Sequence, residues 1–249
     1  MSVPLWRENS YDLTGRVALV TGATGALGQA VCLALLASRA HVYALGEHAR
    51  GDAYDQLRER AGDASGRLTF VQADARDEER VSAVVADVAQ RAGRLDILVN
   101  TIGGFAAGKP VTELETETFD RMLTLNLRPT FLLSKYSARE MAHNHWGRII
   151  NISSRAAVSG RRNAAAYAVA KAGIVTLTEA QGEETRDLGI TVNAVLPSII
   201  DTPVNRAAMP TAAFDRWPKP EEIARVIAFL ASDDAALISG ASIPVYGLA

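Results

Sequence analysis

Short apolar runs alternate along this chain with longer segments of helical pattern, and this alternation constrains the fold more than any other feature of the sequence. Strands that alternate with helices form right-handed βαβ units, in which a parallel sheet is covered by helices on both faces. The strands predicted from the apolar runs cover residues 17–21, 41–45, 68–72, 95–100, 148–152, 191–196 and 242–245. The predicted fold class is therefore α/β, with a doubly wound parallel sheet.

The segments between the predicted strands show apolar residues at the spacing of one helix face. The predicted helices cover residues 26–38, a segment around Val81, Val84, Val85 and Val88, two long segments at about 118–143 and 164–188, and residues 221–231. Residues 197–220 form the one long irregular connection in this prediction. Connections of that length are usually either functional or disordered.

Length and composition fit a single domain that covers residues 1–249, with one core. The chain has 26 basic and 28 acidic residues and no long block of one sign, so we expect neither nucleic acid nor a membrane as a partner. Residues 1–11 lack the apolar core of a secretory signal, and we expect a cytoplasmic protein. The single cysteine, Cys32, excludes an internal disulfide framework and is expected to be buried.

A glycine-rich turn, residues 21–28, lies between the first predicted strand and the first predicted helix. Glycines at such a place allow a tight turn and a close approach of the backbone to a pyrophosphate. The N-terminus of the following helix offers unpaired N–H groups and the positive end of its dipole. The residues expected to contact a dinucleotide cofactor here are Gly22, Thr24, Gly25, Ala26, Leu27 and Gly28.

Tyr167 and Lys171 are four residues apart in a predicted helix, so their side chains lie on one face, a turn apart. A free tyrosine has a pKa of about 10 and exchanges protons poorly at neutral pH. A nearby ammonium favours the phenolate, so we expect Lys171 to lower the pKa of Tyr167. Ser154 follows the predicted strand 148–152, where its hydroxyl could reach Tyr167 and donate to a substrate oxygen. The three residues predict a general acid–base centre.

With these residues, the sequence resembles the short-chain dehydrogenase/reductase family over essentially its whole length. The resemblance implies that Ser154, Tyr167 and Lys171 are catalytic and that Asn126, in Leu125-Asn126-Leu127, belongs to a proton relay. It also implies a Rossmann-type sheet with the strand order 3-2-1-4-5-6-7, and a homo-oligomer that is either a tetramer or a dimer.

The resemblance extends the cofactor site beyond the glycine turn. The aspartate with which the family contacts adenine corresponds to Asp74, its Asn-Asn-Ala-Gly motif to residues 100–103, and the segment that closes on the nicotinamide to residues 197–202. The further cofactor-binding residues that it implies are Asp74, Ala75, Asn100, Thr101, Ile102, Gly103, Tyr167, Lys171, Pro197, Ile200 and Thr202.

Three departures from the family pattern carry expectations of their own. Ala26 stands at the usual middle glycine and Gly25 comes one position earlier, a spacing closer to the epimerase and dehydratase branch of the family. Alanine is small enough that phosphate binding should survive. Thr101 and Ile102 replace Asn-Ala, which should alter packing rather than chemistry. Ser198 replaces a glycine, so the backbone there should avoid positive φ.

The end of the second predicted strand is where NAD-linked relatives place an acid that accepts from the ribose 2′-hydroxyl. By spacing from Gly28, this place is Gly46, followed by Glu47. A carboxylate there would repel the 2′-phosphate of NADP. His48 or Arg50 could offset that repulsion if their loop folds inward. The cofactor is thus NAD or NADP, with a preference for NAD.

The sequence therefore predicts an oxidoreductase that transfers a hydride between a nicotinamide cofactor and a small-molecule carbonyl or alcohol substrate, with Tyr167 as the general acid–base group. One alternative is a reductase of a quinonoid pterin or a similar heterocycle. The other is a dinucleotide-sensing protein without turnover. The intact set of Asn126, Ser154, Tyr167 and Lys171 argues against a sensor, which needs no acid–base relay.

The pterin alternative comes from residues 197–220, which resemble dihydropteridine reductase. We expect this segment to be a substrate lid in which Met209, Phe214 and Trp217 supply an apolar pocket. Dihydropteridine reductase lacks the serine and the helix asparagine, whereas this chain has Ser154 and Asn126. We therefore favour an enzyme that reduces carbonyl compounds and has a lid of this kind over its substrate.

Two pairs of residues stay outside the predicted site. His143 and His145 lack partners at the spacing that a metal needs, so no metal site is expected. Arg161 and Arg162 lie shortly before Tyr167 and could meet an anionic substrate. A solvated loop is the more ordinary interpretation of two adjacent arginines, and it is the one we predict.

Overall fold

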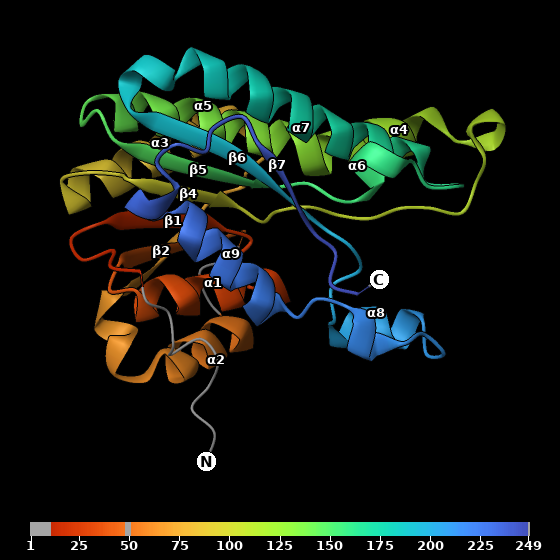
Figure 1. Ribbon diagram of the computed structural model, residues 1–249, viewed down its shortest axis with the longest axis horizontal. Coiled ribbons are helices and arrows are strands. Elements are labelled where there is room, and N and C mark those ends of the chain that lie inside the picture. The colour runs from red at the N-terminus through yellow and green to blue at the C-terminus, as the bar shows by residue number, and fades with distance from the viewer. Residues whose placement is uncertain (1–10, 48–50, 249) are drawn as a thin grey trace.

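A parallel sheet forms the centre of the structure, which is a computed structural model that describes residues 11–47 and 51–248 (Figure 1). Within this range the sheet has seven strands in the order β3-β2-β1-β4-β5-β6-β7, and every neighbouring pair is parallel. The strands are β1 (Val17–Thr21), β2 (His41–Gly46), β3 (Leu68–Gln72), β4 (Ile97–Asn100), β5 (Gly147–Ile152), β6 (Ile190–Pro197) and β7 (Ser242–Val245). The predicted fold class and strand order are confirmed.

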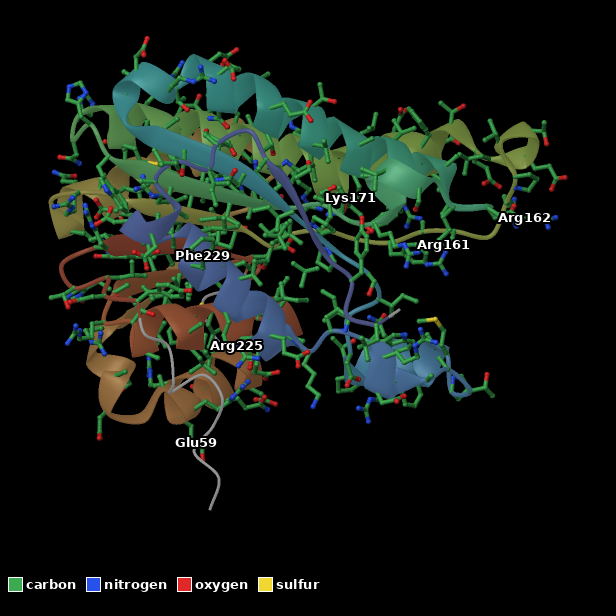
Figure 2. All side chains as sticks on the ribbon, viewed as in Figure 1. Glu59, Arg161, Arg162, Lys171, Arg225 and Phe229 are labelled. Carbon is green, nitrogen blue, oxygen red and sulfur yellow. The ribbon has the colours of Figure 1, made fainter. Side chains whose placement is uncertain are left out.

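Helices cover both faces of this sheet. Figure 2 labels Phe229 and Lys171, which lie on helices on opposite sides of the sheet. The helices on the side of Phe229 are α1 (Ala26–Ala37), α2 (Asp52–Ala61) and α9 (Pro220–Leu230). Those on the other side are α3 (Glu78–Ala92), α5 (Arg128–Ala142) and α7 (Ala165–Glu184). Three short helices, α4 (Thr116–Met122), α6 (Ala156–Ser159) and α8 (Pro203–Ala208), lie toward the carboxyl ends of the strands.

Burial on both faces explains why the strands are continuous apolar runs. Every residue of β1, β5 and β6 is buried, as is usual for a parallel sheet between helix layers. Helix α1 is equally apolar because it packs against the sheet and against α9, and Cys32 within it is buried as predicted. The helix α3 has an explicit beginning and end: Asp77 accepts from the backbone N–H groups of Glu79 and Arg80, and Gly93 follows in the left-handed region.

The prediction of one unbroken helix at residues 118–143 is wrong. This segment is divided into α4, a π-helical turn at Leu123–Leu127, and α5. Pro129, in the first turn of α5, has no N–H to donate, so the hydrogen-bond ladder of an α-helix cannot run through this point. The helix expected at 164–188 ends earlier, at Glu184, and a 3₁₀ turn at Arg186–Leu188 follows.

The expectation that residues 197–220 are the one long irregular connection is also wrong. That segment contains α8 and a 3₁₀ turn at Phe214–Arg216. Thr202 caps α8 by accepting from the N–H of Asn205, and Pro203 occupies its first turn, a common way to begin a helix. Residues 101–115, by contrast, have no regular structure besides a 3₁₀ turn at Val111–Glu113. Ser198 is not among the positive-φ residues, as expected.

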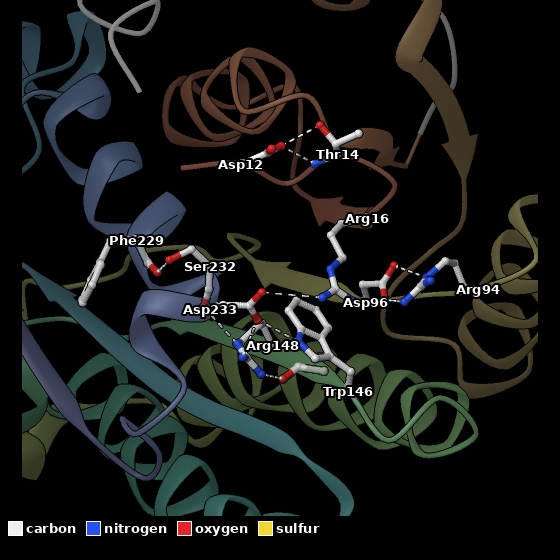
Figure 3. Close-up of polar contacts among 11 residues, drawn as sticks. Asp12, Thr14, Arg16, Arg94, Asp96, Trp146, Arg148, Phe229, Ser232 and Asp233 are labelled. Carbon is white, nitrogen blue, oxygen red and sulfur yellow. Dashed lines mark hydrogen bonds and ion pairs between the residues drawn. The ribbon is translucent and has the colours of Figure 1, made fainter. Parts of the chain in front are cut away.

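A buried carboxylate joins β1 and β4 at the edge of the sheet opposite their carboxyl ends (Figure 3). Asp96 is fully buried and accepts from the backbone N–H of Val17 at 2.9 Å and from Nε of Arg94 at 2.7 Å. The guanidinium of Arg16 lies 3.5 Å from the same carboxylate. Two cations and a backbone donor thus compensate the burial of this charge.

Within the described residues no helix is long and apolar enough to cross a membrane.

Replacing Asp96 should therefore destabilise the protein far more than replacing an exposed ion-pair partner. Asp96→Ala leaves the buried N–H of Val17 unpaired and should lower the free energy of unfolding by about 2–4 kcal/mol, or Tm by roughly 5–15 °C. Asp87, which pairs with Arg91 on the exposed surface of α3, provides the control. Asp87→Ala should leave Tm almost unchanged. Thermal unfolding followed by circular dichroism measures both, and similar small losses would contradict the role of Asp96.

Candidate active site

The segments that follow the strands meet at one edge of the sheet, because the carboxyl ends of parallel strands lie together. The glycine turn follows β1, and Glu47 follows β2. The residues predicted around Asn100, Ser154 and Pro197 follow β4, β5 and β6. The sequence-predicted site residues therefore surround a single region of the molecule.

Two glycines of the turn have structural reasons to be glycine. Gly22 has a φ of +62°, and a Cβ there would lie 2.9 Å from Oγ1 of Thr101. A Cβ on Gly28 would lie 2.2 Å from the carbonyl oxygen of Gly22, so only glycine lets α1 pack this closely on the turn. Gly25 differs, because a Cβ there would find a single neighbour at 3.3 Å.

The beginning of α1 fits a pyrophosphate. Gly25 is its N-cap and provides no side-chain hydrogen bond, and no acidic residue stands in the first turn. Thr24, Gly25 and Ala26 are exposed, whereas Leu27 and Gly28 are buried. The backbone N–H groups of the first helical turn have no partner within the helix and are available to an anion.

An arginine that the sequence analysis missed joins the two acidic residues expected near the adenosine. Arg76 donates to both oxygens of Asp74 at 2.8 Å, and its Nη2 lies 3.2 Å from Oε1 of Glu47. The Arg76 guanidinium holds the pKa of Asp74 below its usual value. Gly46 and Ala75 are buried beside them. His48 and Arg50, considered as counter-charges, lie outside the described residues.

The motif after β4 anchors the backbone with its side chains. Asn100 is buried and donates to Oδ1 of Asn151 at 2.9 Å and to Oγ of Ser134 at 3.2 Å. Thr101 donates its hydroxyl hydrogen to the carbonyl oxygen of Thr21 at 2.5 Å, and Ile102 packs against the core. These contacts fix the end of β4 against β1 and β5, which fits the expectation that the Thr101-Ile102 departure affects packing.

Tyr167, Ser154 and Lys171 lie together at the start of α7. Tyr167 is half-buried and shares a hydrogen bond with Ser154, while Oγ of Ser154 also accepts from the N–H of Ala156 at 3.2 Å. Lys171 is buried one turn further along. Its ammonium donates to the carbonyl oxygen of Ile152 at 2.9 Å and lies 5.9 Å from the centre of the Tyr167 ring.

The expectation that Lys171 lowers the pKa of Tyr167 is wrong for this structure. Burial raises the pKa of Tyr167, and the hydrogen bond with Ser154 and the positive charge of Arg161 offset this only in part. Burial also lowers the pKa of Lys171 to about 8, because its ammonium has left water. Tyr167 consequently keeps its proton at neutral pH, which suits a proton donor.

Asn126 lies on the π-helical turn and is fully buried. Its Nδ2 donates to the carbonyl oxygen of Met122 at 3.0 Å, and its Oδ1 accepts from the N–H of Gly104 at 3.2 Å. A Cβ on Gly103 would lie 2.7 Å from Oδ1 of Asn126 and 3.2 Å from Nζ of Lys171. The structure thus brings Asn126, Gly103 and Lys171 into one cluster.

Phe105 is a neighbour of Tyr167 that the sequence analysis did not select. Its ring is 57% exposed and meets the Tyr167 ring edge-on at 5.0 Å between centres. The guanidinium carbon of Arg161 lies 5.6 Å from the centre of the Phe105 ring. The signal in the sequence is the aromatic residue directly after Gly103-Gly104, in the longest irregular loop at this edge.

Residues 197–220, the segment predicted to be a lid, are held by several hydrogen bonds and an ion pair. The carbonyl oxygen of Pro197 accepts from the N–H of Arg155, and that of Ile200 accepts from Nδ2 of Asn205. Asp201 forms a two-pronged ion pair with Arg206. Trp217, expected to line a pocket, is buried against Phe214 and suits an anchor for the end of the segment, whereas Phe214 and Met209 are only half-buried.

Comparisons with known proteins agree on one family. The pattern for short chain dehydrogenases matches residues 16–213. The chain is 37% identical over 246 residues to the 3-oxoacyl-(acyl-carrier-protein) reductase FabG of Pseudomonas aeruginosa, covering 95% of this chain and 98% of the relative. It is 36% identical over 240 residues to cis-4-hydroxycyclohexanecarboxylate dehydrogenase of Sinomonas cyclohexanicum, covering 93% and 95%. The solved structure of ElxO with NADP bound matches with a TM-score of 0.87 and 28% identity, covering 93% and 97%.

The glycine turn supplies a matched pair of substitutions. Gly28→Ala forces a Cβ against a backbone carbonyl, so we expect a loss of about 3 kcal/mol, a Tm lower by roughly 6–12 °C, and an at least tenfold weaker affinity for the cofactor. Gly25→Ala should lose about 1 kcal/mol or less, because alanine is only a poorer N-cap. Calorimetric titration with NAD and thermal unfolding measure both effects. Equal behaviour of the two variants would contradict the packing argument.

Proposed function

The chain belongs to the short-chain dehydrogenase/reductase family, and from this premise we propose that Tyr167 is the general acid–base group with which it interconverts an alcohol and a carbonyl compound. The protein is an NAD(P)-dependent oxidoreductase. Relatives that are named as dehydrogenases and carbonyl-group reductases favour this activity over the reduction of a pterin, and over a role without turnover.

The hydrogen-bonded pair of Tyr167 and Ser154 carries the proposal. Burial keeps the proton on Tyr167 at neutral pH, so in the reductive direction the phenol donates it to the carbonyl oxygen of the substrate. The hydroxyl of Ser154, at the same edge, would hold that oxygen in place and stabilise the charge that develops on it. The nicotinamide supplies or accepts the hydride when bound.

Lys171 is proposed to return the proton to Tyr167. A pKa of about 8 lets its side chain exchange protons near neutral pH, and it lies one helical turn from the phenol. Asn126 is proposed as a positioning residue, because it holds the backbone of Gly104 beside Lys171 rather than facing the solvent.

The cofactor would lie along the edge already described. The turn from Gly22 to Gly28 would hold the pyrophosphate, and Gly46, Glu47, Asp74 and Ala75 the adenosine. Residues 100–103 and 197–202 would hold the nicotinamide end, with residues 197–220 as a lid over the substrate. A homo-oligomer, either tetramer or dimer, is proposed from the family alone, and its mass in solution would test it.

We propose NAD as the preferred cofactor. Glu47 and Asp74 both pair with Arg76, so these three side chains together carry one net negative charge. A carboxylate accepts a hydrogen bond from a 2′-hydroxyl, whereas a 2′-phosphate would meet repulsion and an arginine that is already paired.

Tyr167→Phe should reduce kcat by at least about a hundredfold, because the ring keeps its packing and loses only the hydroxyl group that transfers the proton. Its affinity for NAD should change by less than about threefold. Tyr136→Phe is the control, since Tyr136 is also half-buried but donates to Glu78 at the start of α3. Absorbance of the reduced nicotinamide follows turnover with a panel of ketones. A Tyr167→Phe variant that kept a tenth of wild-type kcat would disprove the assignment.

The preference for NAD is measured as a ratio of kcat/KM values with NADH and NADPH. We expect a ratio of at least about ten, since one such factor corresponds to about 1.4 kcal/mol. Glu47→Gln removes one of the two negative charges and should lower the ratio, mainly by improving NADPH. A tenfold preference of the wild type for NADPH would overturn the proposal.

A further inference from the structure

The proposed reaction leaves Arg161 without a role, although it stands beside the catalytic tyrosine. Arg161 lies on the loop between α6 and α7 and is exposed. Among the described residues, no carboxylate lies within ion-pair distance of it, and its one side-chain contact of note is with the face of the Phe105 ring. Arg206, which is also exposed near this edge, differs because it is paired with Asp201.

The local sequence reinforces this excess of positive charge. No aspartate or glutamate occurs between Glu140 and Glu179, although the same stretch contains Arg148, Arg155, Arg161, Arg162 and Lys171. The charge of Arg161 also reaches the reacting group, because it is one of the causes that lower the pKa of Tyr167. A negative group placed beside Arg161 would therefore balance a charge that has no carboxylate partner among the described residues.

The position of Arg161 is built into the fold. The N–H of Gly108 donates to the carbonyl oxygen of Asn163 at 2.8 Å, which ties the loop of Phe105 to the loop of Arg161. Asn163 has a φ of +60°, a backbone conformation that residues other than glycine seldom adopt. Two ring contacts then connect the guanidinium to the proton donor. The guanidinium carbon of Arg161 lies 5.6 Å from the centre of the Phe105 ring, and that centre lies 5.0 Å from the centre of the Tyr167 ring.

We propose that Arg161 binds a carboxylate of the substrate, and that the substrate is a small carbonyl compound or alcohol with this acid group a few carbon atoms from the reacting oxygen. The proposal rests on the function proposed for Tyr167. The planar guanidinium offers two parallel donors that match the two oxygens of a carboxylate. The exposed ring of Phe105, between the two polar ends, would contact the apolar carbons of such a molecule.

Arg162 provides a matched control. It is the next residue and is also exposed and basic, yet among the described residues it has no contact with an aromatic ring, and it is not among the causes that shift the pKa of Tyr167. In Figure 2 Arg161 lies below α6 and α7, on the side toward α8, whereas Arg162 projects at the outer end of the loop. A general effect of positive charge would be similar for both arginines, and a specific contact would belong to Arg161.

The first experiment measures binding without turnover. Cyclohexanecarboxylate and its neutral analogue cyclohexanecarboxamide are titrated calorimetrically into the protein saturated with NADH, for the wild type, Arg161→Gln and Arg162→Gln. We expect the wild type to bind the carboxylate at least about tenfold more tightly than the amide, as a hydrogen bond to a charged group would produce. Arg161→Gln should abolish this difference by weakening the carboxylate alone, and Arg162→Gln should keep it.

Equal binding of the two probes by the wild type would overturn the proposal, and so would a preference that survives in Arg161→Gln. A loss of preference that is as large in Arg162→Gln would reduce the effect to general charge and would also overturn it. Turnover of 4-oxocyclohexanecarboxylate tests the proposed function separately. Selective binding without reduction of this ketone or of any neutral ketone would count against the reaction and leave the anion site standing.

Discussion

The hydrogen bonds of one buried side chain, Asn151 in the middle of the sheet, set the position of the elements that carry the site. Its Oδ1 accepts from Asn100 at the end of β4, and its Nδ2 donates to Thr178 on α7 at 3.0 Å. A buried amide with unpaired groups is costly, so these partners are constrained to their places. Ser153 adds a second connection by donating to the backbone carbonyl of Lys171. The start of α7, with Tyr167 and Lys171, is therefore fixed to the same strands from which the loops of the site emerge.

Burial, rather than attraction between the two groups, governs the protonation of the tyrosine and the lysine. Both side chains have left water, and this shifts their pKa values in opposite directions, up for Tyr167 and down for Lys171. The two pKa values therefore move apart from one another, although the two side chains lie one helical turn apart. Positive charge at Arg161, outside this environment, acts in the opposite sense and favours the ionised phenol.

Most of the fold could be predicted because the central strands β1, β4, β5 and β6 are buried along their whole length and are rich in apolar residues. Site residues that belong to sequence motifs, such as Ser154 and Lys171, could also be identified from the sequence. Contacts between loops could not, since Arg76 meets Glu47 and Phe105 meets Tyr167 only after distant strands are aligned. The sign of the pKa shift at Tyr167 depended on burial, and a spacing of four residues contains no information about solvent. The break in the helix before α5 was not predicted because the apolar residues Leu123, Leu125 and Leu127 continue through it.

That π-helical turn has a geometric consequence for everything that follows it. Each residue of an α-helix advances the direction of its side chain by about 100°, so a turn that contains one extra residue rotates the remainder of the helix by that angle about its axis. Met122, before the turn, packs against the start of α7, whereas Leu132 and Leu133, after it, pack against the sheet. The segment from α4 to α5 thereby packs against two different neighbours. Its polar residue Asn126 lies in the turn where the packing face changes. If the turn became α-helical without losing a residue, α5 would rotate by about 100° away from the sheet, whereas deleting the extra residue would let an ordinary α turn form with α5 still facing the sheet. The extra residue and the wide turn therefore depend on each other.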